Sequence, residues 1–160
     1  MNIFDDYTHD VLEACIECEV DFLIVGGYAV NFHGYRRTTG DIDLWIKPCN
    51  DNKLKVINAL KKLEIPQKAL NQLLELDFTK HLVFSDGEVP FKIDFMTYVS
   101  GVDFQEAYSQ KIITEIDELK VPFINMKHLI ISKIGTGRPK DNMDIEELQR
   151  IEAIKKNNKK

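Results

Sequence analysis

The chain has 160 residues, of which 44% are hydrophobic and 29% charged, and its formal net charge at pH 7 is −5. This length suits one domain, and the composition is globular rather than disordered. The acidic balance argues against a protein whose main task is to coat nucleic acid. The apolar runs are too short to span a bilayer, no signal peptide is visible, and the three cysteines are an odd number. We therefore expect a cytoplasmic protein with no membrane partner.

Helices and strands alternate in the first half of the chain, as judged from the spacing of apolar residues. The expected elements are a helix over residues 3–19, a strand over 22–25, a short helix over 28–33, a strand over 42–47 and a helix from about 50 to 63. The pair Gly26-Gly27 ends the first strand, and Asn50 or Asp51 is expected to cap the last helix. The stretch over 65–80 stays open between a helix and a loop.

The second half predicts a hairpin, a further pair of strands and a helical end. The expected elements are strands over 81–85 and 90–97, a helix over 103–110, strands over 111–116 and 119–124, a helix from Asn125 to about 136, and a last helix from near 141. The basic tail over 155–160 is expected to be a frayed, solvated end. This irregular alternation predicts an α+β (α/β) fold with a mixed sheet flanked by helices. We expect a core over 1–124 and a C-terminal helical segment over 125–160 packed on the same domain.

A group of aspartates carries the strongest chemical signal. Asp41 and Asp43 are two residues apart on an expected strand, so their carboxylates project from one face. Like charges this close repel unless a cation lies between them, and Mg²⁺ binds carboxylate oxygens together with substrate phosphates. Asp94 lies in another expected strand, in which Ile93 and Phe95 would face the core. If the two strands are neighbours, Asp94 completes a three-carboxylate cluster.

The aspartates belong to a longer pattern. An Asp-x-Asp pair alone is usually a solvated strand end, and Gly-Gly alone is little more than a turn signal. Here an apolar strand, Gly26-Gly27, a short helix, the segment Arg-x-Thr-x-Asp-x-Asp over 37–43 and the distant Asp94 occur together. The combination resembles the nucleotidyltransferase superfamily with the DNA polymerase β-like fold. The fuller motif is similar to compact bacterial members, among them lincosamide nucleotidyltransferases and the nucleotidyltransferase toxins of abortive-infection systems.

The resemblance implies transfer of a nucleoside monophosphate from an NTP, ATP among them, to an acceptor hydroxyl with release of pyrophosphate. It implies that Asp41, Asp43 and Asp94 are catalytic and bind metal, with two Mg²⁺ ions expected and Mn²⁺ as the alternative. One ion would activate the acceptor oxygen, the other would shield the triphosphate, and Asp94 would accept the hydroxyl proton. Gly26 and Gly27 lack a Cβ, so backbone amides there can approach phosphate oxygens closely.

Further residues are expected to bind the nucleotide or to support the site. Arg37 and Thr39 either contact phosphate or support the loop that positions the aspartates. The segment over 133–144 resembles the Lys…Arg-x-Lys-Asp-x-x-Asp segment of the same bacterial members. Its cations either bind the triphosphate or are solvated charges at helix ends. These cations are Lys133, Arg138 and Lys140. The neighbouring Asp141 is expected to be a helix N-cap rather than a catalytic acid.

Two functions from different classes stay open. The first is an active, metal-dependent nucleotidyltransferase, because all three acids are present. The alternative is a catalytically silent module that binds a nucleotide or a partner protein, for example in a toxin–antitoxin pair. The expected partners are an NTP and an unidentified acceptor. A small molecule is favoured because the chain is too short for a large acceptor domain, with a tRNA end, a protein hydroxyl, a protein partner or a homodimer as alternatives.

Overall fold

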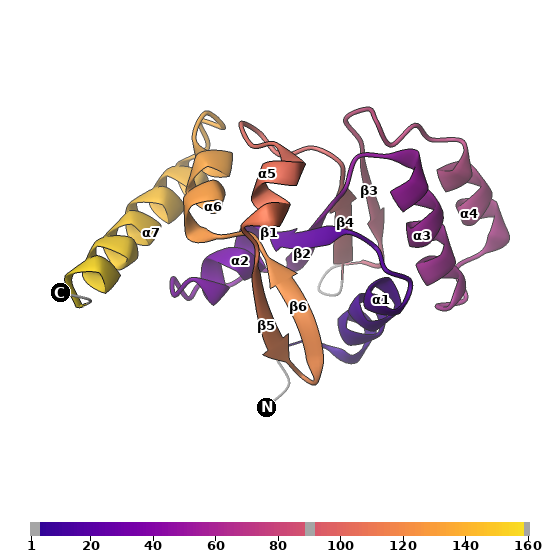
Figure 1. Ribbon diagram of the computed structural model, residues 1–160, viewed down its shortest axis with the longest axis horizontal. Coiled ribbons are helices and arrows are strands. Elements are labelled where there is room, and N and C mark those ends of the chain that lie inside the picture. The colour runs from indigo at the N-terminus through magenta and orange to yellow at the C-terminus, as the bar shows by residue number, and fades with distance from the viewer. Residues whose placement is uncertain (1–3, 89–91, 159–160) are drawn as a thin grey trace.

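The computed structural model describes residues 4–88 and 92–158, and these residues form a mixed sheet with helices on both sides (Figure 1). The sheet has six strands in the order β3-β4-β2-β1-β6-β5. The strands are β1 (Phe22–Val25), β2 (Asp41–Ile46), β3 (Val83–Asp86), β4 (Lys92–Met96), β5 (Ile112–Ile116) and β6 (Leu119–Phe123). This arrangement confirms the expected α+β fold class. Among the described residues, no helix is both long and apolar enough to cross a membrane.

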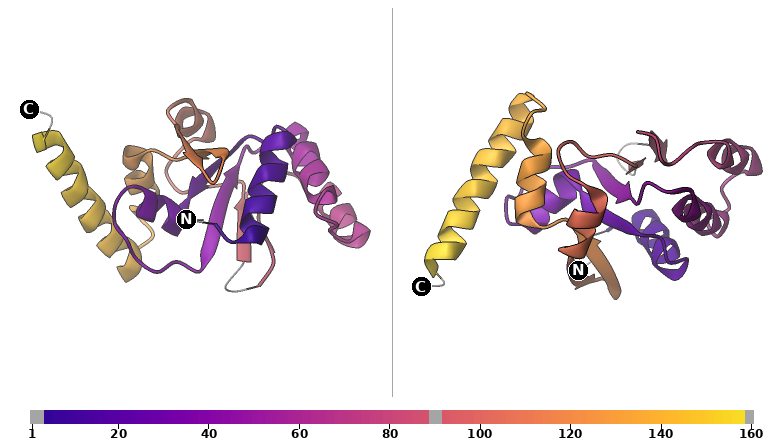
Figure 2. Two further views of the ribbon diagram at one scale, coloured as in Figure 1. Left: turned by 90° about the horizontal axis from the view of Figure 1, so that it is seen from below. Right: turned by 45° about the horizontal axis from the view of Figure 1, so that its top comes forward.

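Two pairs of helices lie at opposite ends of the molecule, and the other helices lie between them. They are α1 (Asp6–Glu17), α2 (Gly26–Phe32), α3 (Asn50–Lys61), α4 (Gln67–Leu74), α5 (Phe104–Ser109), α6 (Met126–Lys133) and α7 (Pro139–Asn158). Helices α3 and α4 pack against each other at one end of the molecule, and α6 packs on α7 at the opposite end. Both ends keep this separation in the two further views (Figure 2). The central strands therefore lie between two pairs of helices.

The strand register brings the distant acids together. Strand β2 pairs antiparallel with β1 and parallel with β4, and Asp43 lies opposite Asp94 in the second pair. Because side chains alternate between the faces of a sheet, Leu44 and Phe95 occupy the face opposite to these carboxylates. Both are fully buried, and burial of a side chain of this size stabilises the fold by about 1.5–3 kcal/mol. The expectation that the two acidic strands are neighbours is confirmed.

The two faces of the sheet have different covers. Helices α3 and α4 cover the face of Phe95. On the face of the carboxylates, Phe104 of α5 packs its ring edge-on against Trp45 of β2, with ring centroids 5.2 Å apart. Strand β3 lies at the edge of the sheet, and its Val83, opposite Met96, is 70% exposed. On the carboxylate face, α5 therefore covers Trp45 of β2, whereas Val83 of β3 is left exposed.

The last two strands and one helix cap lie where they were expected. Asp117 and Glu118 both have positive φ angles, 50° and 70°, which a tight two-residue turn between antiparallel strands requires. This turn joins β5 to β6 where the two strands were expected. Asn125 caps α6 as predicted, because its side-chain oxygen accepts a hydrogen bond from the backbone N–H of His128.

Several helix ends in the first half differ from the expectation. Helix α2 begins at Gly26 rather than at residue 28, because Val25 at the end of β1 is already its N-cap. The prediction that Asn50 or Asp51 caps α3 is wrong, because Cys49 is the N-cap. The side-chain oxygen of Asn50 instead accepts a hydrogen bond from the backbone N–H of Phe78. The open stretch over 65–80 contains α4.

The C-terminal helices also differ from the expectation. Helix α6 ends at Lys133, because Ile134 has an extended backbone. Helix α7 begins at Pro139, a residue that suits a first helical turn, so Asp141 lies inside the helix and its prediction as N-cap is wrong. The tail is exposed as predicted, but it is helical to Asn158. The prediction of a frayed end is therefore wrong for residues 155–158. Residues 1–3, 89–91 and 159–160, on which some expected elements fall, lie outside the described residues. The expected division into a core over 1–124 and a C-terminal helical segment over 125–160 stays a prediction.

Candidate functional site

A polar pocket of about 300 Å³ brings together every residue that the sequence singled out for catalysis or nucleotide binding. The segments that form it are the start of α2, the loop before β2, the strands β2 and β4, the end of α6 and the start of α7. Its lining residues are Gly26, Gly27, Arg37, Thr39, Gly40, Asp41, Asp43, Asp94, Lys133, Arg138, Lys140 and Asp141. The pocket thus combines carboxylates from the sheet with cations from the C-terminal helices.

The carboxylates from the sheet repel one another. Burial and, after it, the nearby charges of Asp94 and Asp41 together raise the pKa of Asp43 to about 6. Asp94 has neighbours of its own, because its Oδ1 accepts a 2.6 Å hydrogen bond from Ser85 Oγ and lies 3.4 Å from Lys92 Nζ. No three His, Cys, Asp or Glu side chains of the described chain stand together as a ready-made metal site.

The chemistry of these donors nevertheless fits a divalent cation. Asp41, Asp43 and Asp94 border one pocket, and all three offer the hard oxygen ligands that Mg²⁺ and Mn²⁺ prefer. A cation between them would favour the ionised form of Asp43, whose pKa is raised in its absence. Mg²⁺ usually keeps substrate phosphates among its ligands, so an incomplete set of protein ligands is compatible with this ion.

Two glycines leave room for the acidic strand. Gly26 has a positive φ of 65°, a conformation that side chains other than glycine rarely adopt. A Cβ on Gly26 would overlap the Asp43 carboxylate, and one on Gly27 would overlap the side chain of Thr39. The Thr39 hydroxyl in turn donates a 3.2 Å hydrogen bond to the carbonyl of Asp41. The glycine pair therefore lets the backbone at the start of α2 approach the carboxylates directly.

A network of paired charges joins the loop before β2 to the C-terminal helices. Arg37 donates two hydrogen bonds to Asp144, from Nε at 2.8 Å and from Nη2 at 2.9 Å. Lys133 Nζ lies 2.9 Å from Asp144 Oδ2, which also accepts from Arg37 Nη2, and 3.1 Å from Asp141 Oδ1. Asp144 was not selected as a site residue, although it closes the quoted segment over 133–144. The contact with Asp144 favours a supporting role for Arg37.

The cations of this segment divide into buried and exposed groups. Lys133 is only 7% exposed, so the alternative of a solvated helix-end charge is wrong for it. Burial raises the pKa of Asp141, but hydrogen bonds from Thr136, Lys133 and Arg138 outweigh this effect and hold the pKa below its usual value. The side chain of Arg138 is 71% exposed, and Lys140 is exposed as well. The pocket therefore has two cations that are held by Asp144, namely Lys133 and Arg37, and two cations that face solvent.

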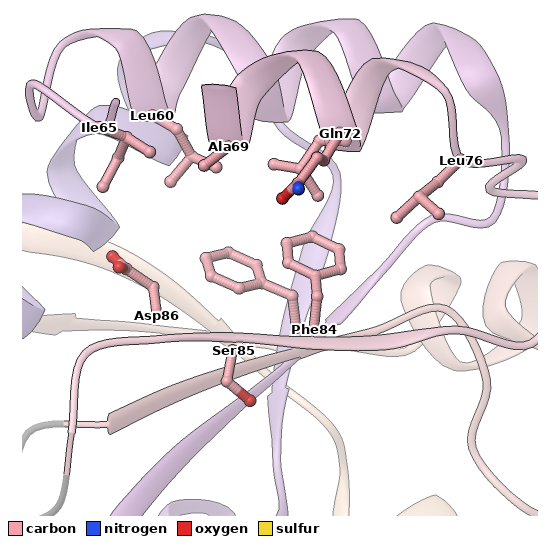
Figure 3. Close-up of a pocket in the computed structure, with 10 residues that line it drawn as sticks. Leu60, Ile65, Ala69, Gln72, Leu76, Phe84, Ser85 and Asp86 are labelled. Atoms are coloured by element: carbon pink, nitrogen blue, oxygen red, sulfur yellow. The ribbon is translucent and has the colours of Figure 1, made fainter. Parts of the chain in front are cut away.

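A second pocket, of about 260 Å³, lies on the other face of the sheet between the helices α3 and α4 and the strands β3 and β4. Figure 3 shows Leu60, Ile65 and Leu76 reaching from the helical side toward Phe84, whereas Ser85 points away from the pocket. Its lining is mainly apolar and contains no lysine or arginine. A triphosphate needs cations and backbone donors, so we do not assign the nucleotide to this pocket.

Comparisons with known proteins agree with this architecture. Residues 8–157 match the family described as "Nucleotidyltransferase of unknown function (DUF6036)". The lincosamide antibiotic adenylyltransferase LnuA, solved with lincomycin bound, is similar with a TM-score of 0.54 and 16% identity over 94% of this chain and 99% of that chain. The antibiotic-resistance factor ANT(2'')-Ia is similar with a TM-score of 0.51 and 12% identity over 94% of this chain and 90% of that chain.

These comparisons carry different weight. At such low identities the likeness to the two solved structures shows a shared fold. No curated protein matches the sequence. The family match, in contrast, spans nearly the whole chain and includes every residue of the polar pocket. The chain therefore belongs to this nucleotidyltransferase family, as its aspartate and glycine motifs predicted.

Proposed function

We propose that the protein transfers a nucleoside monophosphate from an NTP to a hydroxyl group of an acceptor and releases pyrophosphate. The observation that best supports this proposal is that carboxylates from the sheet and cations from the C-terminal segment line the same pocket. Asp41, Asp43 and Asp94 line one part of it, and Lys133, Arg138 and Lys140 line another. A reaction that moves a phosphoryl group needs carboxylates near the reacting oxygen and cations around the departing phosphates.

In this reaction, different residues would bind the phosphates and accept the proton. The backbone at Gly26 and Gly27, with Lys133 close by, binds the phosphates. Asp94 accepts the proton of the acceptor hydroxyl, whose oxygen forms a bond to the α-phosphorus while the bond from that phosphorus to the departing pyrophosphate breaks. A divalent cation held by Asp41, Asp43 and Asp94 would supply charge stabilisation for the reacting oxygens. The protein contributes positioning and charge neutralisation rather than a covalent intermediate.

A melting-temperature screen against the four NTPs, each with and without Mg²⁺, tests this proposal. A ligand at 100 times its Kd stabilises a protein by about 2.7 kcal/mol. For a chain of this size we expect one NTP–Mg²⁺ pair to raise Tm by roughly 5–10 °C. Either component alone should give a much smaller shift, and Asp43→Asn should lose the joint effect. Pyrophosphate release is then followed with the NTP that binds.

The outcomes separate the two candidate functions. No joint shift with any NTP contradicts a nucleotide site in this pocket. A joint shift without pyrophosphate release, over a broad panel of hydroxyl acceptors, supports the catalytically silent module instead. Asp10→Asn is the matched control, because Asp10 is an exposed carboxylate on α1 outside the pocket.

A further inference from the structure

The carboxylate face of the sheet leads from the polar pocket to another concave site. In β2 the residue on this face after Asp43 is Trp45, and in β4 the residue after Asp94 is Met96. Trp45 lies opposite Met96, which in turn lies opposite Val83 of β3. At about 3.3 Å per residue, Trp45 begins roughly 7 Å from Asp43 along the strand. The exposed Val83 leaves the route along β4 and β3 open.

We name the concave site at the end of this route the aromatic pocket. It has a volume of about 240 Å³, and its lining includes Trp45, Lys80, His81, Thr97, Tyr98 and Asp103. The rings of His81 and Tyr98 stack, with centroids 3.8 Å apart and planes 14° from parallel. Tyr98 remains 47% exposed despite this contact. The pocket therefore presents a flat aromatic surface of the kind on which a planar ring can stack.

The aromatic pocket also has hydrogen-bond donors that the described residues do not use. Trp45 Nε1 is buried and makes no hydrogen bond within the described chain. The Tyr98 hydroxyl and the Lys80 ammonium likewise have no hydrogen bond or ion pair there, although Lys80 acts on Asp77 at longer range. Two of the acceptor groups, in contrast, are occupied, because one carboxylate oxygen of Asp103 caps α5 and the Thr97 hydroxyl bridges backbone groups. Unused donors match a ligand with several acceptor atoms.

The direction of the reaction decides which substrate reaches this pocket. Gly26 follows β1 and Lys133 ends the helix after β6, so the groups that would bind the phosphates lie on the β1–β6 side of Asp43. The aromatic pocket begins at Trp45 of β2, and its residues before β3 and after β4, among them His81 and Tyr98, lie on the other side of β2. In an in-line displacement the attacking hydroxyl approaches opposite to the departing pyrophosphate. The β3–β4 side is therefore the side of the acceptor.

We propose that the aromatic pocket binds a planar ring of the acceptor, and that the acceptor is a small nucleoside-like molecule. This inference rests on the proposed transfer reaction. The ring stacks on Tyr98, its acceptor atoms pair with the exposed Tyr98 hydroxyl and Lys80 ammonium, and a hydroxyl on the attached sugar reaches Asp94. Tyr98 is four residues beyond Asp94, about 13 Å along an extended chain, so the ring and the hydroxyl belong to separate parts of the molecule. Between them lie the apolar Val83 and Met96 rather than cations, which disfavours a phosphate-linked polymer.

The single tryptophan of the chain makes the pocket directly observable. Because Trp45 lines the pocket, its fluorescence should respond to adenosine, guanosine, cytidine or uridine titrated into the full-length protein. We expect a saturable change with at least one of them, at least a tenfold weaker Kd in Tyr98→Ala, and a smaller loss in Lys80→Ala. Lys68→Ala is the matched control, because Lys68 is an exposed lysine outside the pocket. ATP with Mg²⁺ should leave the nucleoside bound.

Each alternative result overturns a defined part of the inference. The absence of a saturable change with all four nucleosides overturns it, as does a change that neither Tyr98→Ala nor Lys80→Ala weakens. Displacement of the nucleoside by ATP with Mg²⁺ overturns it as well, because the pocket would then hold the base of the NTP. Pyrophosphate release is measured in parallel. Binding that depends on Tyr98 without release contradicts the transfer reaction, whereas release that is independent of Tyr98 contradicts only the acceptor pocket.

Discussion

Two groups of charges share the polar pocket, and they are built in opposite ways. On β2 and β4, like charges lie together, and the pKa of Asp43 is raised by burial and by its acidic neighbours. On α6 and α7, opposite charges are paired, with Asp144 held between Arg37 and Lys133. The paired group fixes the pocket in the free protein, whereas burial and acidic neighbours oppose the ionisation of Asp43 until a cation arrives.

Lys133 connects the two groups. It forms ion pairs with the carboxylates of α7, and its charge also acts to lower the pKa of Asp43. The ion pairs with Asp141 and Asp144 therefore hold the Lys133 ammonium near Asp43, although Lys133 forms no ion pair with Asp43 within the described residues. Within one pocket, the paired charges around Asp144 therefore stabilise the fold, whereas the carboxylates of β2 and β4 serve to bind a ligand. The following substitutions test this division.

The largest effect is expected from Asp144→Asn. Asp144 has a side chain only 1% exposed, and its loss leaves Arg37 and Lys133 without their shared partner. Removing one member of a buried ion pair typically costs about 3–5 kcal/mol. We expect a corresponding fall in the free energy of unfolding, measured by urea denaturation. Glu147→Gln, on the same helix but in a more exposed pair with Arg150, should cost less than about 1 kcal/mol. Equal costs for both variants would contradict a framework role for Asp144.

A change of opposite sign is expected from Asp43→Asn without metal. The folded pKa of about 6 exceeds the ordinary value of 3.8, so the folded protein loses stability as pH rises from about 4 through 6. Asparagine removes this loss, which amounts to at most about 3 kcal/mol. The Tm of the variant should therefore exceed that of the wild type at pH 7.5, with little gain at pH 4. Asp10→Asn should show no such pH dependence. A variant that melts well below the wild type at pH 7.5 would make Asp43 a structural hydrogen-bonding residue.

The smallest effect is expected from Lys92→Gln. Lys92 Nζ lies 3.4 Å from Asp94 Oδ1, and its side chain is 35% exposed, so solvent screens the pair. Such pairs contribute about 0–1 kcal/mol, and less at high salt. Urea denaturation at low and high NaCl should show a change within this range. A cost near that of Asp144→Asn would mean that the sheet carboxylates are also part of the stabilising framework.

Sequence patterns were reliable where the physical cause is local. The apolar run over 22–25 predicted β1, and the residues over 111–116 and 119–124 predicted β5 and β6, because these patterns depend on neighbouring residues. The stretch over 65–80 stayed ambiguous, since α4 is short and buries only Leu70 and Leu73. The cap of α3 was misplaced because Asn50 pairs with Phe78, a residue 28 positions away.

The sequence by itself determined the family motif and the common face of Asp41 and Asp43, because alternation along a strand is a local property. Only the tertiary structure decided that β4 lies beside β2, so that Asp94 stands opposite Asp43. It also decided that Lys133 is buried against Asp144, and that unused donors gather beside Tyr98. Ion pairs and pockets arise where segments far apart in the chain meet. Their existence therefore depends on strand order and helix packing, which no short pattern encodes.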